Sequence, residues 1–149
     1  MLDYNKKEER IMNITYERKI NYYETDRMGI VHHSNYIRFL EEARCYLLEK
    51  IDMPFDMLEE NGVTIPVLGV NVTYKHHVTF ADVLEIKVFI KEYNGVRMTI
   101  GYDVKNKNTG DIVIIAETKH CFTDRNLKPV NLKKYAPEFS NKYENLLEK

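Results

Sequence analysis

Residues 22–36 read YYETDRMGIVHHSNY and join two segments with different periodicities. In the segment that leads into them, apolar or aromatic residues alternate with mostly polar neighbours at Ile14, Tyr16, Ile20 and Tyr22. A period of two predicts a first strand. After residue 36, apolar residues recur every three or four positions, which predicts a helix. The chain is therefore expected to run from a strand, through this loop, into a helix.

The predicted helix carries a broad apolar stripe, so most of its circumference should be buried. The stripe consists of Tyr36, Phe39, Leu40, Ala43, Tyr46 and Leu47. Pro54 closes the helix, and residues 55–60 are expected to form one further short helical turn.

Four more alternating runs follow, at residues 68–74, 84–90, 96–104 and 112–116. Asn94-Gly95 predicts a tight type I′ hairpin in which both central residues have positive φ, and residues 108–110 predict a second hairpin. Consecutive hairpins imply an antiparallel sheet. The predicted fold is α+β, with about five antiparallel strands wrapped around one long central helix.

The chain has 149 residues, 44% of them hydrophobic and 30% charged, which fits a single folded domain spanning 1–149. Its core is expected at about residues 14–124, with a polar N-terminal tail (1–12) and a C-terminal extension (125–149). The polar stretch 138–149 is expected to be accessory. The formal net charge of -1 argues against nucleic acid as a partner.

The cysteines and the lengths of the apolar runs indicate the cellular compartment of the protein. Cys45 and Cys121 form no C-x-x-C pair and suit a reducing compartment. The charged N-terminus lacks the apolar run of a signal peptide, and no segment is long enough to span a membrane. A cytoplasmic location is expected.

Several common sites can be excluded from the motifs. Ser34 and Ser140 are the chain's serines, neither lies in G-x-S-x-G, and the six glycines form no nucleotide-binding loop. The pairs His32-His33 and His76-His77 resemble metal ligands, but neighbours on a strand point to opposite faces. No metal site is expected, and His76-His77 is interpreted as a partly solvated pair at a sheet end.

The loop at residues 26–36 resembles a known family. Asp26, Gly29, Val31, His33, Asn35 and Tyr36 match the signature D-x-x-G-x-V-x-[HY]-x-N-Y of the 4-hydroxybenzoyl-CoA thioesterase family. Phe39, Glu42, Ala43 and Arg44 look like the helix that follows it. The order of predicted elements is similar to the family's hotdog fold over about residues 14–124.

This resemblance implies that Asp26 attacks a thioester carbonyl or activates water against it, near the start of the helix. The first amides of a helix lack internal partners and can donate to an oxygen that becomes negative. The backbone amide of His33 is the implied donor, and its imidazole either shapes the site or is a structural residue. Considered alone, Asp26 would be a turn or cap residue.

The remaining site residues are weaker candidates. Tyr22 and Asn35 are expected to contact the substrate, although Tyr22 also fits a half-buried strand tyrosine. Glu24 is interpreted as a surface residue. Lys91 and Arg97, beside the Asn94-Gly95 turn, are candidates for the nucleotide phosphates, or are ordinary solvated charges.

The sequence thus predicts a thioesterase that converts acyl-CoA or acyl-carrier-protein thioesters to free acid and thiol, without metal or redox cofactor. The alternatives are a hotdog dehydratase that recruits Glu41 or Glu42, and a noncatalytic acyl-thioester binding module. A homodimer or homotetramer is expected, because an isolated sheet leaves an unpaired edge and relatives pair their sheets to complete the site. The acyl group and the choice between nucleophile and general base stay open.

Overall fold

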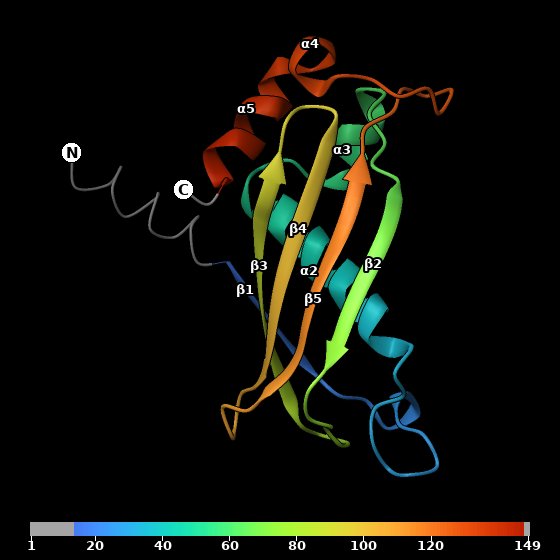
Figure 1. Cartoon of the computed structure of the whole chain (residues 1–149), viewed down its shortest axis with the longest axis vertical. Coiled ribbons are helices and arrows are strands. Elements are labelled where there is room, and N and C mark those ends of the chain that lie inside the picture. The colour runs from blue at the N-terminus through green and yellow to red at the C-terminus, as the bar shows by residue number, and fades with distance from the viewer. Residues whose placement is uncertain (1–13, 148–149) are drawn as a thin grey trace, which may run out of the picture.

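The computed structural model describes residues 14–147 and shows a five-stranded antiparallel sheet with the order β1-β3-β4-β5-β2 (Figure 1). The strands are β1 (Thr15–Lys19), β2 (Val67–Tyr74), β3 (Val83–Tyr93), β4 (Arg97–Asn106) and β5 (Ile112–Cys121). The predicted α+β class, the antiparallel sheet and the number of strands are confirmed. The predicted N-terminal tail (1–12) lies outside the described residues.

The hairpin between β3 and β4 is built differently from the prediction. The Asn94 N–H donates to the Arg97 carbonyl at 3.2 Å, so Gly95 and Val96 are the central residues. Gly95 has φ +91°, whereas Asn94 does not have positive φ. Glycine in the first central position is the pattern of a type II′ turn, so the predicted type I′ turn is wrong. The Asn94 Oδ1 instead accepts the amides of Val96 and Arg97 at 2.9 and 2.8 Å.

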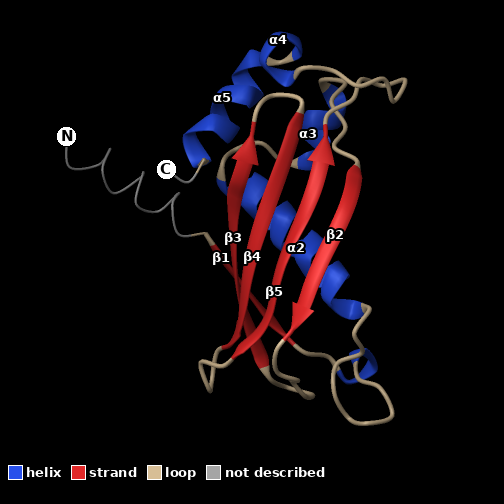
Figure 2. Ribbon diagram, in the orientation of Figure 1, coloured by secondary structure: helices blue, strands red, loops and turns tan. Residues whose placement is uncertain are grey.

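Helix α2 (Asn35–Lys50) lies across one face of the sheet and contacts β1 and β3 (Figure 2). Its buried residues include most of the predicted stripe, namely Tyr36, Phe39, Leu40, Ala43 and Leu47. Tyr46 is partly buried, and its ring lies 5.4 Å from that of Tyr16 on β1. The short helix α3 (Phe55–Glu60) follows, as predicted.

The C-terminal segment was predicted incorrectly as a polar accessory tail. It forms α4 (Leu132–Tyr135) and α5 (Pro137–Leu146). Phe139 and Tyr143 of α5 belong to the hydrophobic core, with 9% and 1% of their surfaces exposed. Their spacing of four residues puts them on one face of α5, together with the buried Ser140. A fold with one central helix is therefore an incomplete description, since α5 also packs on the core.

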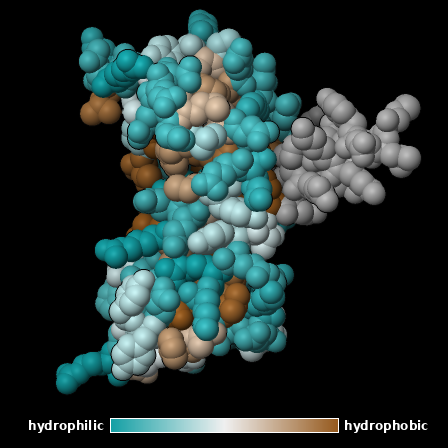
Figure 3. Space-filling view, turned by 180° about the vertical axis from the view of Figure 1, so that it is seen from behind, coloured by the Kyte–Doolittle hydropathy of each residue, from teal (hydrophilic) through white to brown (hydrophobic). Residues whose placement is uncertain are grey.

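Strand β2 forms one edge of the sheet. It exposes the apolar or aromatic side chains of Val67, Leu68, Val70 and Tyr74. Apolar side chains are visible along this margin of the molecule when it is seen from behind (Figure 3). An unpaired edge strand with an apolar surface is a site at which another strand can pair.

Candidate active site

The loop that carries Asp26 is a tight turn closed by backbone hydrogen bonds. The Asp26 N–H donates to the Ile30 carbonyl at 2.8 Å, and the Gly29 N–H donates to the Asp26 carbonyl at 3.0 Å. Gly29 has φ +78°, which a side chain at this position would disfavour. The Asp26 Oδ1 accepts the Met28 N–H at 2.8 Å. No described residue hydrogen-bonds to its Oδ2, so one carboxylate oxygen holds the turn and the other is available.

This turn is attached to the start of α2 through Glu24. The Glu24 carbonyl accepts the His32 N–H at 2.9 Å and the Asn35 side-chain amide at 2.8 Å. Asn35 is the first residue of α2, so its side chain links the loop to the helix. Its Nδ2 thus has a structural partner at the position where a substrate contact was predicted.

The side chain of Glu24 is buried, which corrects its interpretation as a surface residue. It forms an ion pair with Arg18, and its Oε1 accepts the Asn21 N–H at 2.7 Å. Arg18 also pairs with Glu42 on α2 at 2.8 Å and lies 4.1 Å from the centre of the Phe39 ring. Burial alone would lower the pKa of Arg18, but its bonds to Glu24 and Glu42 outweigh that effect and raise it.

The backbone just before α2 can accept a developing negative charge. The helix begins with Ser34 as its N-cap residue, which forms no side-chain cap hydrogen bond. Within residues 14–147, the His33 N–H has no hydrogen-bond partner, while the His33 carbonyl accepts the Tyr74 hydroxyl at 3.1 Å. The His32 and His33 rings stack at 4.3 Å. The prediction that they point to opposite faces is wrong, because they lie in a turn and not on a strand.

Comparison with known proteins identifies the family. A family model described as the Thioesterase-like superfamily matches residues 20–142. The chain belongs to this superfamily. It is 32% identical to a putative acyl-CoA thioesterase of Bacillus subtilis (strain 168), over 86% of this chain and 93% of the relative.

Solved structures agree with this membership. The chain is similar to a DHNA-CoA thioesterase from Staphylococcus aureus, with a TM-score of 0.84, 26% identity and 89% of each chain covered. It is also similar to a hypothetical protein from Aquifex aeolicus, with a TM-score of 0.77 and 35% identity over 83% of this chain and 96% of the other. The family resemblance predicted from residues 26–36 is confirmed.

In this thioesterase-like chain, Tyr22 lies beside the loop but not in a strand. It begins the 3-10 helix η1 (Tyr22–Glu24), and 76% of its surface is exposed. Its ring lies edge-on to Phe80 at 5.8 Å, and its hydroxyl makes no hydrogen bond with Asp26. The expected half-buried strand tyrosine is therefore wrong, and Tyr22 forms part of an exposed aromatic surface.

Lys91 and Arg97 lie at the opposite end of the sheet from Asp26 within one chain (Figure 1). The Lys91 ammonium pairs with Glu117 at 3.0 Å, and Arg97 is exposed at the start of β4. A single chain therefore does not bring either cation to the Asp26 loop. His76 and His77 are both exposed just after β2, as expected.

Two further features of this thioesterase-like fold were not predicted from the sequence. Arg18 and Glu42 are 24 positions apart, and Arg44 is buried although it lies within a helix of charged and apolar residues. Neither feature follows from a local period. Among residues 14–147, no cluster of three His, Cys, Asp or Glu residues is arranged to hold a metal ion, and no helix is long and apolar enough to cross a membrane.

Proposed function

We propose that this protein hydrolyses acyl-CoA thioesters at the loop between η1 and α2, with Asp26 as the reacting carboxylate. The observation that carries the proposal is that the Asp26 turn is fastened to the first residue of α2 through the Glu24 carbonyl. A carboxylate and the unpartnered His33 amide thereby belong to one fixed structure. Fixed geometry between a reacting group and an oxyanion donor is a major source of catalysis.

The chemistry has two routes. Either the Asp26 carboxylate attacks the carbonyl carbon and water hydrolyses the resulting anhydride, or it removes a proton from water that attacks directly. In both routes the carbon–sulfur bond breaks. In the direct route the thiolate takes the proton that Asp26 removed from water; in the anhydride route it takes a proton from solvent, and the later attack of water releases the acid and regenerates the Asp26 carboxylate. The carbonyl oxygen gains negative charge, which the His33 N–H and the positive end of the α2 dipole stabilise.

A dehydratase is a less suitable function for this site. That reaction would need Glu41 or Glu42 as its acidic group. Glu42 is already paired with Arg18 at 2.8 Å, and Glu41 is exposed. Hydrolysis by the loop aspartate uses a carboxylate oxygen that has no competing partner among the described residues.

The substrate test is the release of thiol from acyl-CoAs with short, medium, long and aromatic acyl groups, with acyl-pantetheine for comparison. We expect removal of the nucleotide to lower kcat/KM by less than 100-fold, because the central residues of the β3–β4 turn, Gly95 and Val96, are uncharged and Lys91 is paired with Glu117. A larger loss would show a firm grip on the nucleotide and exclude a carrier protein as the better substrate. Absence of thiol release from every substrate would favour a noncatalytic binding module.

The proposal includes a homo-oligomer in the cytoplasm. Antiparallel pairing of two β2 edges would bring the hairpin end of one sheet close to the Asp26 loop of the other, since β2 ends beside that loop at Tyr74. Lys91 and Arg97 of each chain would then approach the site of its partner. The free thiols of Cys45 and Cys121 support a reducing compartment.

Light scattering at micromolar concentration is expected to give at least twice the 17.7 kDa monomer mass. Val70→Lys, in the middle of the exposed edge, is expected to shift the mass towards the monomer, because it puts charge into an apolar contact. Ile112→Lys, at the exposed start of β5, serves as the control and should leave the mass unchanged. A wild-type mass near 17.7 kDa would refute the oligomer.

A further inference from the structure

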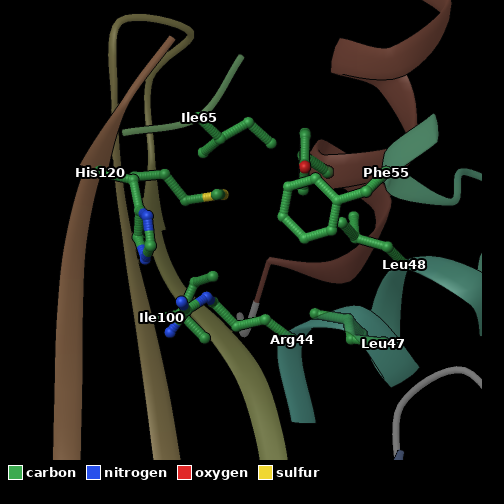
Figure 4. A pocket seen from close by; sticks show the side chains of 9 residues that line it. Arg44, Leu47, Leu48, Phe55, Ile65, Ile100 and His120 are labelled. Carbon is green, nitrogen blue, oxygen red and sulfur yellow. The ribbon is translucent and has the colours of Figure 1, made fainter. Parts of the chain in front are cut away.

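A small cavity of about 40 Å³ lies between the sheet and the helices, at the end of α2 away from the Asp26 loop. Most of its lining is apolar, including Leu48, Phe55 and Ile100 (Figure 4). Arg44 reaches from α2 towards the sheet, and His120 points from β5 into the same space (Figure 4). An apolar cavity with a few polar groups is the usual form of a small-ligand site.

Among residues 14–147, Arg44 is a buried cation without an anionic partner. Its exposed fraction is 9%, and none of the ion pairs formed by residues 14–147 includes it. Among the described residues, its Nη1 donates to the Tyr102 hydroxyl at 3.3 Å, which leaves most of its five N–H groups unengaged. Burial of an uncompensated charge is costly, so the position favours an anion.

Two more polar atoms at the cavity lack partners. The Tyr143 hydroxyl is buried and forms no hydrogen bond, and the buried His120 Nδ1 has no hydrogen bond of regular geometry although the carbonyls of Ile65 and Pro66 lie near the ring. The His120 Nε2 is bonded to the Thr118 hydroxyl at 2.7 Å, and Thr118 is bonded to Tyr102 at 2.7 Å. Unpaired buried polar atoms are rare in folded proteins and call for a partner.

His120 does not add a second charge to this cavity. Burial lowers its pKa to about 4, the positive charge of Arg44 adds to this effect, and the nearby carbonyls of Ile65 and Pro66 oppose it. The ring is thus neutral at neutral pH. Arg44 is the cation to be compensated.

We propose that this cavity binds one small carboxylate-like anion, with Arg44 as its ionic partner and the Tyr143 hydroxyl as a hydrogen-bond donor. The volume is enough for roughly three water molecules, or for one such group. Water would satisfy the two unpaired atoms but would leave the charge of Arg44 uncompensated. The anion is either free or the end of an acyl chain, and the second source rests on the proposed function.

The probe is sodium formate, compared with sodium gluconate at equal ionic strength in a chloride-free buffer, because gluconate is too large for the cavity. We expect formate to raise the melting temperature saturably, by about 3–6 °C at ten times its Kd. Arg44→Met should abolish the difference between the two salts, and Tyr143→Phe should reduce it. Arg38→Met, at an exposed position of the same helix, should retain it.

Equal melting temperatures of the wild type in the two salts, or a full formate effect in Arg44→Met, would overturn the site. If Arg44→Met does not fold, the site is tested by two other results. The rise in melting temperature with formate must saturate in the wild type, and it must be smaller in Tyr143→Phe. None of these measurements needs catalysis, so failure of this site and failure of the proposed hydrolysis are distinguishable.

Enzyme kinetics distinguish a free anion from a carboxylate at the end of an acyl chain. The two substrate sets are ω-carboxyacyl-CoAs and unsubstituted acyl-CoAs of the same lengths. If the acyl chain supplies the carboxylate, saturating formate raises the KM of the carboxylated substrate and leaves the KM of the other unchanged. If the anion is free, formate changes neither KM.

Discussion

Asp26→Asn is expected to reduce kcat/KM for thioester hydrolysis by at least about 100-fold while the protein remains folded. The amide can neither attack a carbonyl carbon nor take a proton from water. It does keep an oxygen that can accept the Met28 N–H, so the turn closed by the 2.8 Å bond from Met28 survives. Thiol release and thermal unfolding of the same preparation measure the two effects separately.

A matched control exists in a second turn of the chain. The Asp124 Oδ1 accepts the amides of Asn126 and Lys128 at 2.8 and 3.0 Å, which is the same structural task that Asp26 performs. Asp124→Asn should therefore leave both rate and stability nearly unchanged. If Asp26→Asn lowers the melting temperature but not the rate, Asp26 is a turn residue and the proposed reacting group is wrong.

The second large effect concerns Arg18, whose replacement by Met is expected to destabilise the fold by about 3–5 kcal/mol. The Glu24 side chain, with 6% of its surface exposed, would lose its cation and remain buried with a negative charge. Glu24→Gln should cost less, about 1–2 kcal/mol, because Arg18 keeps its partner Glu42. Urea unfolding measures both losses.

An exposed ion pair provides the comparison for this prediction. Lys107 and Glu17 are bonded at 2.9 Å with 45% and 51% of their side chains exposed, so Lys107→Met should leave the free energy of unfolding nearly unchanged. Similar losses for Arg18→Met and Lys107→Met would show that the buried pair has no special role. In that case the loop at Asp26 would be held by its backbone bonds and by the side chains of Asn35 and Asp26.

The parts of the fold that were predicted correctly depend on local periods. Alternation marked the strands, and the three- and four-residue spacing marked the buried face of α2 at Tyr36, Leu40 and Leu47. The α5 helix was missed because Phe139 and Tyr143 are two aromatic residues in a polar segment. Two positions are too few to establish a helical period. The core on which these two side chains pack is formed by strands that are distant in the sequence.

The candidate site was predicted as a motif but not as a structure. The signature pointed to Asp26 and Asn35, but it could not show that Asn35 bonds the Glu24 carbonyl, which lies eleven positions earlier. Burial of Glu24 depends on its ion pair with Arg18 and on the packing of α2. Neither can be predicted from the residues next to Glu24 in the sequence. The turn at Asn94 is a similar case. Its position was predicted from the sequence, but its central residues were not.

Tyr74 belongs to two structures at once. It ends the edge strand β2, where half of its surface is exposed, and its hydroxyl donates to the His33 carbonyl at 3.1 Å. Its ring also lies 5.6 Å from that of Tyr36 in the first turn of α2. A substitution that refits this edge to a different partner therefore also disturbs the start of the helix. Tyr74 therefore couples the exposed edge of β2 to the first turn of α2, beside the candidate active site.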